Sequence, residues 1–287
     1  MKDKKQDNEV YILGSETGKG GKKKIQSWKW ILAVVCVLLI LGSIFYYYSN
    51  KEQTPDYYFE PEETQQSISV SIVDTIQSSV ENGYIEVLEE VVNDVPLLIY
   101  VPHKLTMSLA LGMPDVTDPD ILFATMAADI RRDNKQIVGD FVLAGKRLAR
   151  GVAKKGFCAI ENNKVTIGLG ESTPLLQQVI DSKGSFFRQY PLVHNGELIE
   201  NKPKNKSVRR ALAVRNERII MVESKQKESF HDFSQALIDV GVTDAIYLVG
   251  GDAYGWYYNK EHVRREFGEQ LSDLPENISY IIWRNEE

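Results

Sequence analysis

Hydrophobic and polar residues divide the chain into four stretches of different character. Residues 1–27 are polar and rich in lysine and glycine, which is typical of a disordered tail. Residues 28–48 contain an uncharged apolar run, and residues 49–66 combine proline, glutamine and acidic residues as a tether does. From residue 67 to residue 287, short apolar segments alternate with turn residues, which predicts one folded domain.

The apolar run from Trp30 to Tyr48 has the length of a transmembrane helix. At about 1.5 Å per residue it would span about 28 Å, close to the thickness of the hydrocarbon core of a bilayer. Four lysines between residues 22 and 29 precede the run, and aromatic residues lie at both of its ends. Because positive charge favours the cytoplasmic side, we expect a single-pass protein of a bacterial inner (plasma) membrane. Its amino terminus would be cytoplasmic, and the residues after Asn50 periplasmic or extracellular.

A cleaved signal peptide is the alternative interpretation of this run. The basic region is long, however, and the apolar run exceeds the core of a usual signal peptide. Residues 41–48 (LGSIFYYY) also contain no A-x-A-like cleavage site. We therefore predict a cytoplasmic tail (1–27), a transmembrane helix (28–48), an acidic tether (49–66) and an extracytoplasmic domain (67–287).

Strands dominate the secondary structure predicted for the domain. Apolar segments of strand length occupy residues 84–92, 96–101, 105–111, 121–130, 245–249 and 278–283. Three hairpins are also predicted, with turns at Gly145, at Asn162-Asn163 and around Asn216. Asparagine and glycine suit these turns because they tolerate positive φ.

Two helices are predicted between these strands. The first begins near Ser172 or Thr173 and ends near Asp181, with Pro174 in its first turn. The second has Ser229 as its N-cap, and apolar residues recur at helical spacing as far as Val240. The fold class is therefore α+β: a mixed, sheet-rich single domain with a few packed helices, preceded by one transmembrane helix.

Charge and cysteine content exclude several classes of function and site. Residues 1–27 carry seven lysines and four acidic residues, which gives them a net charge of +3. Because the net charge of the whole chain is −6, the remaining residues have a net charge of −9. A domain this acidic lacks the electrostatic footprint of a nucleic-acid-binding protein. Cys36 lies in the apolar run and Cys158 in the domain, so they cannot form an intramolecular disulfide, and a Cys/His zinc site is excluded. No cofactor is predicted, while a divalent cation stays open.

The segment from Val242 to Tyr258 (VTDAIYLVGGDAYGWYY) carries the first candidate site. Adjacent Gly250 and Gly251 at the end of a predicted strand allow close approach of the backbone to a ligand, and Asp252 would project beside them. The aromatic side chains that follow, Tyr254 and Trp256 among them, could stack on a sugar. The alternative is a tight turn whose aromatic residues close the core.

Two further candidates lie near the ends of other predicted strands. Arg209 or Arg210 could hold a phosphate bidentately at the start of a strand, although a solvated basic loop is the alternative. Asp129 ends an apolar segment, where a carboxylate would lie at the edge of a sheet. The sequence contains no nucleophile elbow, P-loop or dinucleotide-binding motif.

In order and spacing these segments resemble the phosphodiester glycosidase family. The resemblance covers roughly residues 120 to 260 and rests on four segments in the same order. They are ATMAADIRRDNKQIVGDFVLAG, the turn YPLVHNGELI, the strand pair RRALAVRNERIIMVES and DFSQALIDVGVTDAIYLVGGDAYG. Three positions depart from the family pattern. AADIRR replaces Asn-Gly-Gly-Phe-Phe, Val249 replaces the Asp of Asp-Gly-Gly, and Arg210 follows the motif arginine Arg209 in place of a small residue.

The resemblance implies hydrolysis of a sugar phosphodiester in an envelope or exopolysaccharide glycan. Asp252 and Asp129 would be the acid and base, because glycosidic cleavage needs an acid at the leaving oxygen. Arg209 would hold the phosphate, and Gly250, Gly251, Tyr254 and Trp256 would bind substrate. The alternatives are a non-catalytic glycan-binding module of the cell envelope, which the loss of the motif Asp favours, and a structural partner in an envelope assembly.

Overall fold

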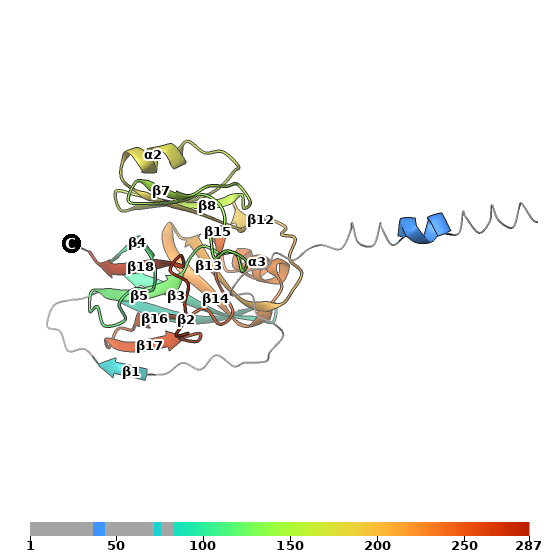
Figure 1. Ribbon diagram of the computed structural model, residues 1–287. Helices are drawn as coiled ribbons and strands as arrows, with labels where there is room; N and C mark the ends of the chain where they lie inside the picture. Colours follow the sequence, from blue (N-terminus) through green and yellow to red (C-terminus); the bar gives the residue numbers. More distant parts are fainter. Residues whose placement is uncertain (1–36, 44–71, 76–82, 287) are drawn as a thin grey trace, which may run out of the picture. The chain divides into compact units, whose positions relative to one another are not determined.

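The computed structural model describes residues 37–43, 72–75 and 83–286 (Figure 1). Residues 37–43 are helical. The predicted cytoplasmic tail, the rest of the predicted transmembrane segment and the predicted tether lie outside the described residues. Within the described part of the chain, no helix has both the length and the apolar character needed to cross a membrane.

Three antiparallel sheets build the domain (Figure 1). In spatial order, the seven-stranded sheet contains β12 (Glu197–Leu198), β11 (Pro191–His194), β15 (Val242–Leu248), β13 (Ser207–Arg215), β14 (Arg218–Glu228), β3 (Val95–His103) and β2 (Tyr84–Val92). The six-stranded sheet contains β1 (Ile72–Thr75), β17 (Val263–Phe267), β16 (Gly255–Tyr258), β5 (Ile121–Met126), β18 (Ser279–Asn285) and β4 (Leu105–Leu111). The five-stranded sheet contains β7 (Lys146–Ala149), β6 (Phe141–Leu143), β10 (Ser185–Gln189), β8 (Gly156–Glu161) and β9 (Lys164–Leu169).

The sheets bury one continuous hydrophobic cluster between them. It includes Phe123 of the six-stranded sheet, Cys158 of the five-stranded sheet and Leu212 of the seven-stranded sheet. A second cluster lies on the other face of the seven-stranded sheet, under helix α3 (Phe230–Asp239). Successive residues of β13 therefore face different environments, since side chains alternate across a strand. This alternation decides the surroundings of Arg209 and Arg210.

Both predicted helices of the domain are present. Helix α2 (Leu175–Asp181) buries Val179 against the five-stranded sheet. Helix α3 begins after its predicted N-cap, Ser229, whose hydroxyl accepts a hydrogen bond from the backbone N–H of Asp232 at 3.0 Å. Phe233 and Leu237, predicted to face inward, are fully buried.

Replacing Ser229 by alanine is expected to lower the free energy of unfolding by about 1 kcal/mol, because one N–H of the first helical turn loses its acceptor. The measurement is urea-induced unfolding of the full-length protein in detergent. Ser229→Thr keeps the hydroxyl and should stay close to the wild type. Equal unfolding midpoints for all three proteins would contradict the capping role.

The predicted hairpin turns are confirmed, whereas three features of the sheets differ from expectation. Asn162, Asn163 and Asn216 all have positive φ, as these turns require. Among the described residues, the paired strands of all three sheets run antiparallel, so the sheets are not mixed in direction. Strand β5 ends at Met126 and not at Ile130, and the strands β1, β10, β16 and β17 were not predicted.

Candidate functional site

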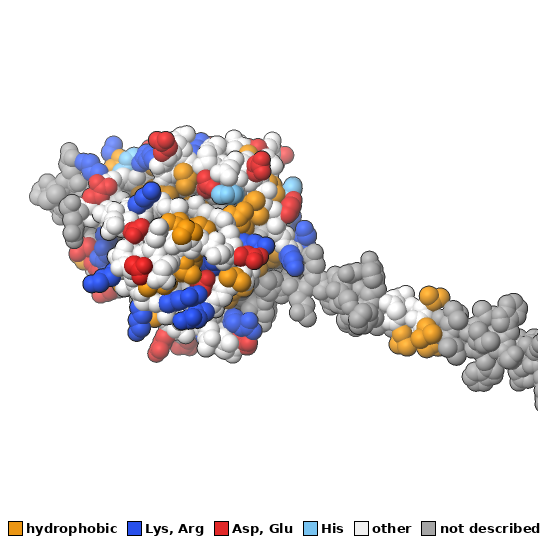
Figure 2. Space-filling model, turned by 90° about the horizontal axis from the view of Figure 1, so that it is seen from above, with side chains coloured by type: hydrophobic (Ala, Val, Ile, Leu, Met, Phe, Trp, Pro, Cys, Tyr) orange, Lys and Arg blue, Asp and Glu red, His pale blue; other side chains and the backbone are white. Residues whose placement is uncertain are grey.

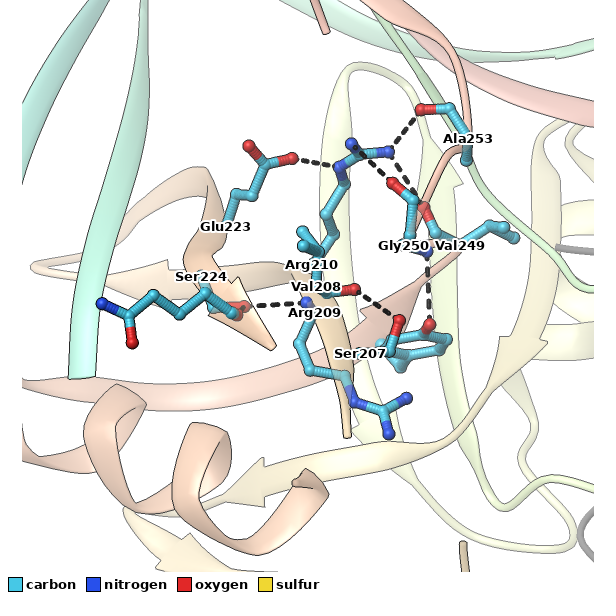
Figure 3. Close-up of polar contacts among 12 residues, drawn as sticks. Ser207, Val208, Arg209, Arg210, Glu223, Ser224, Val249, Gly250 and Ala253 are labelled. Carbon is cyan, nitrogen blue, oxygen red and sulfur yellow. Dashed lines mark hydrogen bonds and ion pairs between the residues drawn. The ribbon is translucent and has the colours of Figure 1, made fainter. Parts of the chain in front are cut away.

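Arg210 neutralises a buried carboxylate and holds the segment that contains the two glycines. Its guanidinium and the carboxylate of Glu223 form an ion pair, and neither side chain is exposed to solvent. Nη1 of Arg210 also donates to the carbonyl oxygen of Ala253 at 2.6 Å, and it lies 3.4 Å from that of Val249 (Figure 3). Burial raises the pKa of Tyr100, and the nearby negative charge of Glu223 raises it further. Because its guanidinium pairs with Glu223 and binds the backbone after the two glycines, Arg210 has a structural role.

Arg209 points to the opposite face of β13 and lacks such a partner (Figure 3). Its Nε donates to the carbonyl oxygen of Glu228 at 3.0 Å, and Nη2 donates to that of Asn205. The guanidinium lies over the ring of Phe230, 4.1 Å from its centroid. No carboxylate among the described residues pairs with Arg209, and its Nη1 is buried without a hydrogen-bond acceptor.

Asp129 forms a buried ion pair with Lys154, and both side chains are at least 95% buried. The ammonium group of Lys154 also donates to the side-chain oxygen of Gln189 at 3.0 Å and lies over the ring of Tyr190, 4.1 Å from its centroid. Asp129 was predicted to end the strand 121–130, but it lies three residues beyond the end of β5, at Met126. Its charge is held by a lysine from the loop between β7 and β8.

Three aromatic rings connect Lys154 with Arg209. The ring of Tyr190 packs on that of Phe230, with 5.2 Å between centroids, and both rings contact Tyr247. Lys154 lies over Tyr190 and Arg209 lies over Phe230, so two buried cations contact one aromatic group. We call Asp129, Lys154, Tyr190, Phe230, Tyr247 and Arg209 the cationic–aromatic cluster.

Gly250 and Gly251 join this cluster through the backbone. The N–H of Gly250 donates to the hydroxyl of Tyr247 at 3.2 Å, and that of Gly251 donates to the carbonyl oxygen of Val208 at 2.9 Å. A Cβ atom on Gly250 would lie 2.2 Å from the same carbonyl oxygen. Glycine is therefore required here by the neighbouring strand β13, whereas the sequence suggested a close approach to a ligand.

The other predicted site residues, Asp252, Tyr254 and Trp256, are not among the residues of the cluster. Asp252 is exposed at the turn that follows the two glycines. Tyr254 is 2% exposed and Trp256 is fully buried, and both pack in the core of the six-stranded sheet. Their rings are covered by protein, so their position matches the alternative interpretation in which the aromatic residues close the core. A role for either residue in sugar binding stays a prediction that this burial does not support.

A second buried ionic network holds the loop that carries Lys154. Arg188 donates through Nε to the carboxylate of Asp140 at 3.0 Å and through Nη1 to the carbonyl oxygens of Gly170 and Lys154. Arg147 pairs with the other oxygen of Asp140. Burial alone would raise the pKa of Asp140, but the hydrogen bonds from Arg147 and Arg188 outweigh it and lower that pKa. Asp140 therefore stays ionised at neutral pH and fixes the loop.

Sequence reasoning missed Lys154, Gln189 and Tyr190. Lys154 is 25 positions from Asp129 in the sequence, and nothing in its local pattern separates it from the exposed Lys155. Tyr190 does precede Pro191 in the turn segment that carries the family resemblance, so the motif contained a signal for it. Among the described residues, no three His, Cys, Asp or Glu side chains lie close enough together to hold a metal ion.

Comparison with known proteins gives this arrangement a context. The chain is similar in structure to the catalytic domain of zebrafish N-acetylglucosamine-1-phosphodiester alpha-N-acetylglucosaminidase auto-inhibited by its pro-peptide, with a TM-score of 0.51 and 14% identity over 77% of this chain and 89% of that one. A hypothetical protein from Synechocystis is similar with a TM-score of 0.51 and 10% identity, over 75% of this chain and 64% of that one. At such identities the likeness shows a shared fold.

No curated protein matches the sequence significantly. Residues 122–278, more than half of the 287, match the phosphodiester glycosidase family. The chain therefore belongs to the phosphodiester glycosidase family.

Proposed function

We propose that this protein hydrolyses a sugar phosphodiester at the cationic–aromatic cluster. The observation that carries the proposal is the contrast among the three arginines that are at most 1% exposed. Arg188 and Arg210 are neutralised by Asp140 and Glu223, whereas Arg209 has no carboxylate partner among the described residues. A buried unpaired charge is costly unless a ligand or another group compensates it. A phosphate group would supply the missing negative charge.

The proposed hydrolysis needs a positive charge next to the leaving phosphate. Hydrolysis breaks the bond between the anomeric carbon and the bridging oxygen, adds the hydroxyl of water to that carbon and releases a phosphate monoester. Negative charge grows on the leaving phosphate while the sugar acquires oxocarbenium character. The guanidinium of Arg209 would stabilise that negative charge through the free Nη1, as preorganised donors do. Asp129, oriented by Lys154, would act on the water as the base.

Substrate access requires a change in the loop that covers Arg209. Nη2 of Arg209 binds the backbone oxygen of Asn205, and the side-chain oxygen of Asn205 lies 3.4 Å from it. Lys202, Lys204 and Lys206 are exposed on the same loop. An incoming phosphate would take the place of Asn205 at the guanidinium, and the three lysines would attract the anion. Asp252 remains the candidate acid, because its exposed carboxylate lies two residues beyond Gly250.

Turnover by carboxylate variants tests the proposal. Asp129→Asn and Asp252→Asn should each lower the release of reducing sugar from a sugar-1-phosphodiester by about 10²- to 10⁴-fold, the usual contribution of an acid or base. Asp244→Asn serves as a control, because this half-exposed carboxylate pairs with His194 outside the cluster. Wild-type turnover in both candidate variants would contradict the assignment.

The alternative function is a non-catalytic glycan-binding module. Val249 at the position of the motif Asp favours it, because that side chain is buried and offers no proton. In that case the wild type would bind the phosphodiester without releasing sugar. Glycan retention would then fall in an Arg209→Gln variant, while Asp129→Asn would change it little.

We also propose that the protein is a single-pass membrane protein with its carboxyl-terminal domain outside the cytoplasm. The uncharged run from Trp30 to Tyr48 and the lysines before it support this topology. A phosphatase reporter that is active only outside the cytoplasm should be active when fused to the carboxyl terminus. An inactive carboxyl-terminal reporter together with an active amino-terminal one would reverse the orientation.

A further inference from the structure

A cleft of about 490 Å³ lies over strand β7, and the charged side chains that line it are both arginines. Its lining comes from four separate segments of the chain: Leu111, Gln136, Ile137, Arg147, Leu148, Ala149, Arg150 and Asn277. The lining includes two arginines and no carboxylate. The volume is in the range of pockets that hold small molecules. We call it the arginine cleft.

The two arginines leave donors free for a ligand. Arg147 uses Nη2 for its ion pair with Asp140, but its Nε is buried and has no acceptor among the described residues. Arg150 is exposed, and no hydrogen bond or ion pair engages its side chain in the described part of the chain. Both guanidinium groups line the same cleft, and the exposed one of Arg150 has its N–H donors available. Such donors suit a phosphate, which accepts bidentate hydrogen bonds.

The rest of the lining suits the sugar to which such a phosphate is attached. Leu111 and Leu148 are 38% and 40% exposed, so each presents an apolar surface on which the C–H face of a sugar can pack. The exposed side-chain amides of Gln136 and Asn277 can exchange hydrogen bonds with hydroxyl groups. Figure 2 shows hydrophobic side chains between charged ones on one face of the domain, so exposed apolar surface next to cations is a feature of this protein.

Two segments of the chain connect the cleft with the candidate site. Ile137 pairs with Ile130, the residue after Asp129, and the N–H of Val138 donates to the backbone oxygen of Asp129 at 2.8 Å. Arg150 begins the loop that carries Lys154, and Asp140 fixes this loop by accepting a hydrogen bond from the N–H of Gly151 at 3.1 Å. A chain of linked sugars bound at the cluster could therefore continue into the cleft.

We infer that the arginine cleft binds a second phosphorylated sugar of the substrate, with phosphate on Arg147 and Arg150 and the sugar on Leu111 and Leu148. The link to turnover rests on the proposed function, whereas binding does not. The substrate class that follows is a polymer in which sugars alternate with phosphodiesters. Binding of the neighbouring unit would contribute energy that positions the scissile bond.

Binding of glucose 1-phosphate and of inorganic phosphate to the full-length protein, measured by calorimetry, tests the inference. Arg150→Gln should weaken binding of both probes about tenfold, which corresponds to the loss of one charge-assisted hydrogen bond. Leu148→Ser should weaken the binding of glucose 1-phosphate and leave that of phosphate unchanged. Arg218→Gln is the matched control, because Arg218 is an exposed arginine that lines a different cleft.

Unchanged binding in Arg150→Gln, or equal weakening in Arg218→Gln, would overturn the inference. If both probes respond equally to Leu148→Ser, the cleft takes phosphate alone and the sugar assignment is wrong. The outcome is separable from that of the proposed function. If binding depends on Arg150 but the wild type shows no turnover, only the proposed hydrolysis is contradicted. If the wild type shows turnover and Arg150→Gln leaves it unchanged, only the role of the cleft is contradicted.

Discussion

Replacing Arg210 by methionine is expected to lower the free energy of unfolding by about 3–5 kcal/mol. The substitution leaves the fully buried carboxylate of Glu223 without a countercharge. It also removes the donor to the carbonyl oxygen of Ala253, beyond the two glycines. Urea-induced unfolding of the full-length protein, followed by tryptophan fluorescence in detergent, measures the change.

The double variant Arg210→Met/Glu223→Leu is the control for this experiment. Removing both charges should recover most of the lost stability, since a buried ion pair contributes little beyond its own desolvation cost. The remaining deficit would come from the carbonyl oxygens left without a donor. A loss below about 1 kcal/mol in Arg210→Met, or no recovery in the double variant, would contradict the structural role of this pair.

Replacing the adjacent Arg209 by glutamine is expected to affect activity much more than stability. The catalytic efficiency kcat/KM for a sugar-1-phosphodiester should fall by about 10²- to 10³-fold, because a preorganised donor to the leaving phosphate is lost. The free energy of unfolding should change less than in Arg210→Met, since no carboxylate of the described residues depends on Arg209. Initial rates of sugar release and urea unfolding measure the two effects.

Arg209→Lys refines this test. Lysine keeps the charge but lacks the planar fork of donors, so it should recover part of the activity and not all of it. Because Arg209 and Arg210 are neighbours on β13, each variant also controls for the substitution of a buried arginine at this place. A loss of 3–5 kcal/mol in Arg209→Gln with unchanged specific activity would show that Arg209 is only structural.

The elements that local chemistry determines were predictable from the sequence. Helix α3 has a serine cap and a stripe of apolar residues, and the hairpin turns contain asparagines that accept positive φ. The segment GWYY was harder, because a strand buried on both faces has the same aromatic residues as a binding surface. In the structure it is β16, paired with β5 and β17, and Trp256 is covered.

The candidate site was only partly predictable, because its charges meet through tertiary structure. The sequence suggested Asp129 and Arg209 as candidates but gave no sign of Lys154, which the loop after β7 brings to Asp129. Side chains alternate along β13, so Arg209 and Arg210 face opposite sides. Only the structure shows that Glu223 lies on the side of Arg210, which leaves Arg209 without a countercharge among the described residues.

The release of reducing sugar from a defined sugar-1-phosphodiester by the full-length protein tests the central claim most directly. We expect one reducing sugar and one phosphate monoester per bond cleaved by the wild type, and at least a hundredfold less from Arg209→Gln. If the wild type binds phosphodiesters and releases no sugar, hydrolysis at this cluster is contradicted. Equal turnover by the wild type and Arg209→Gln would contradict it as well.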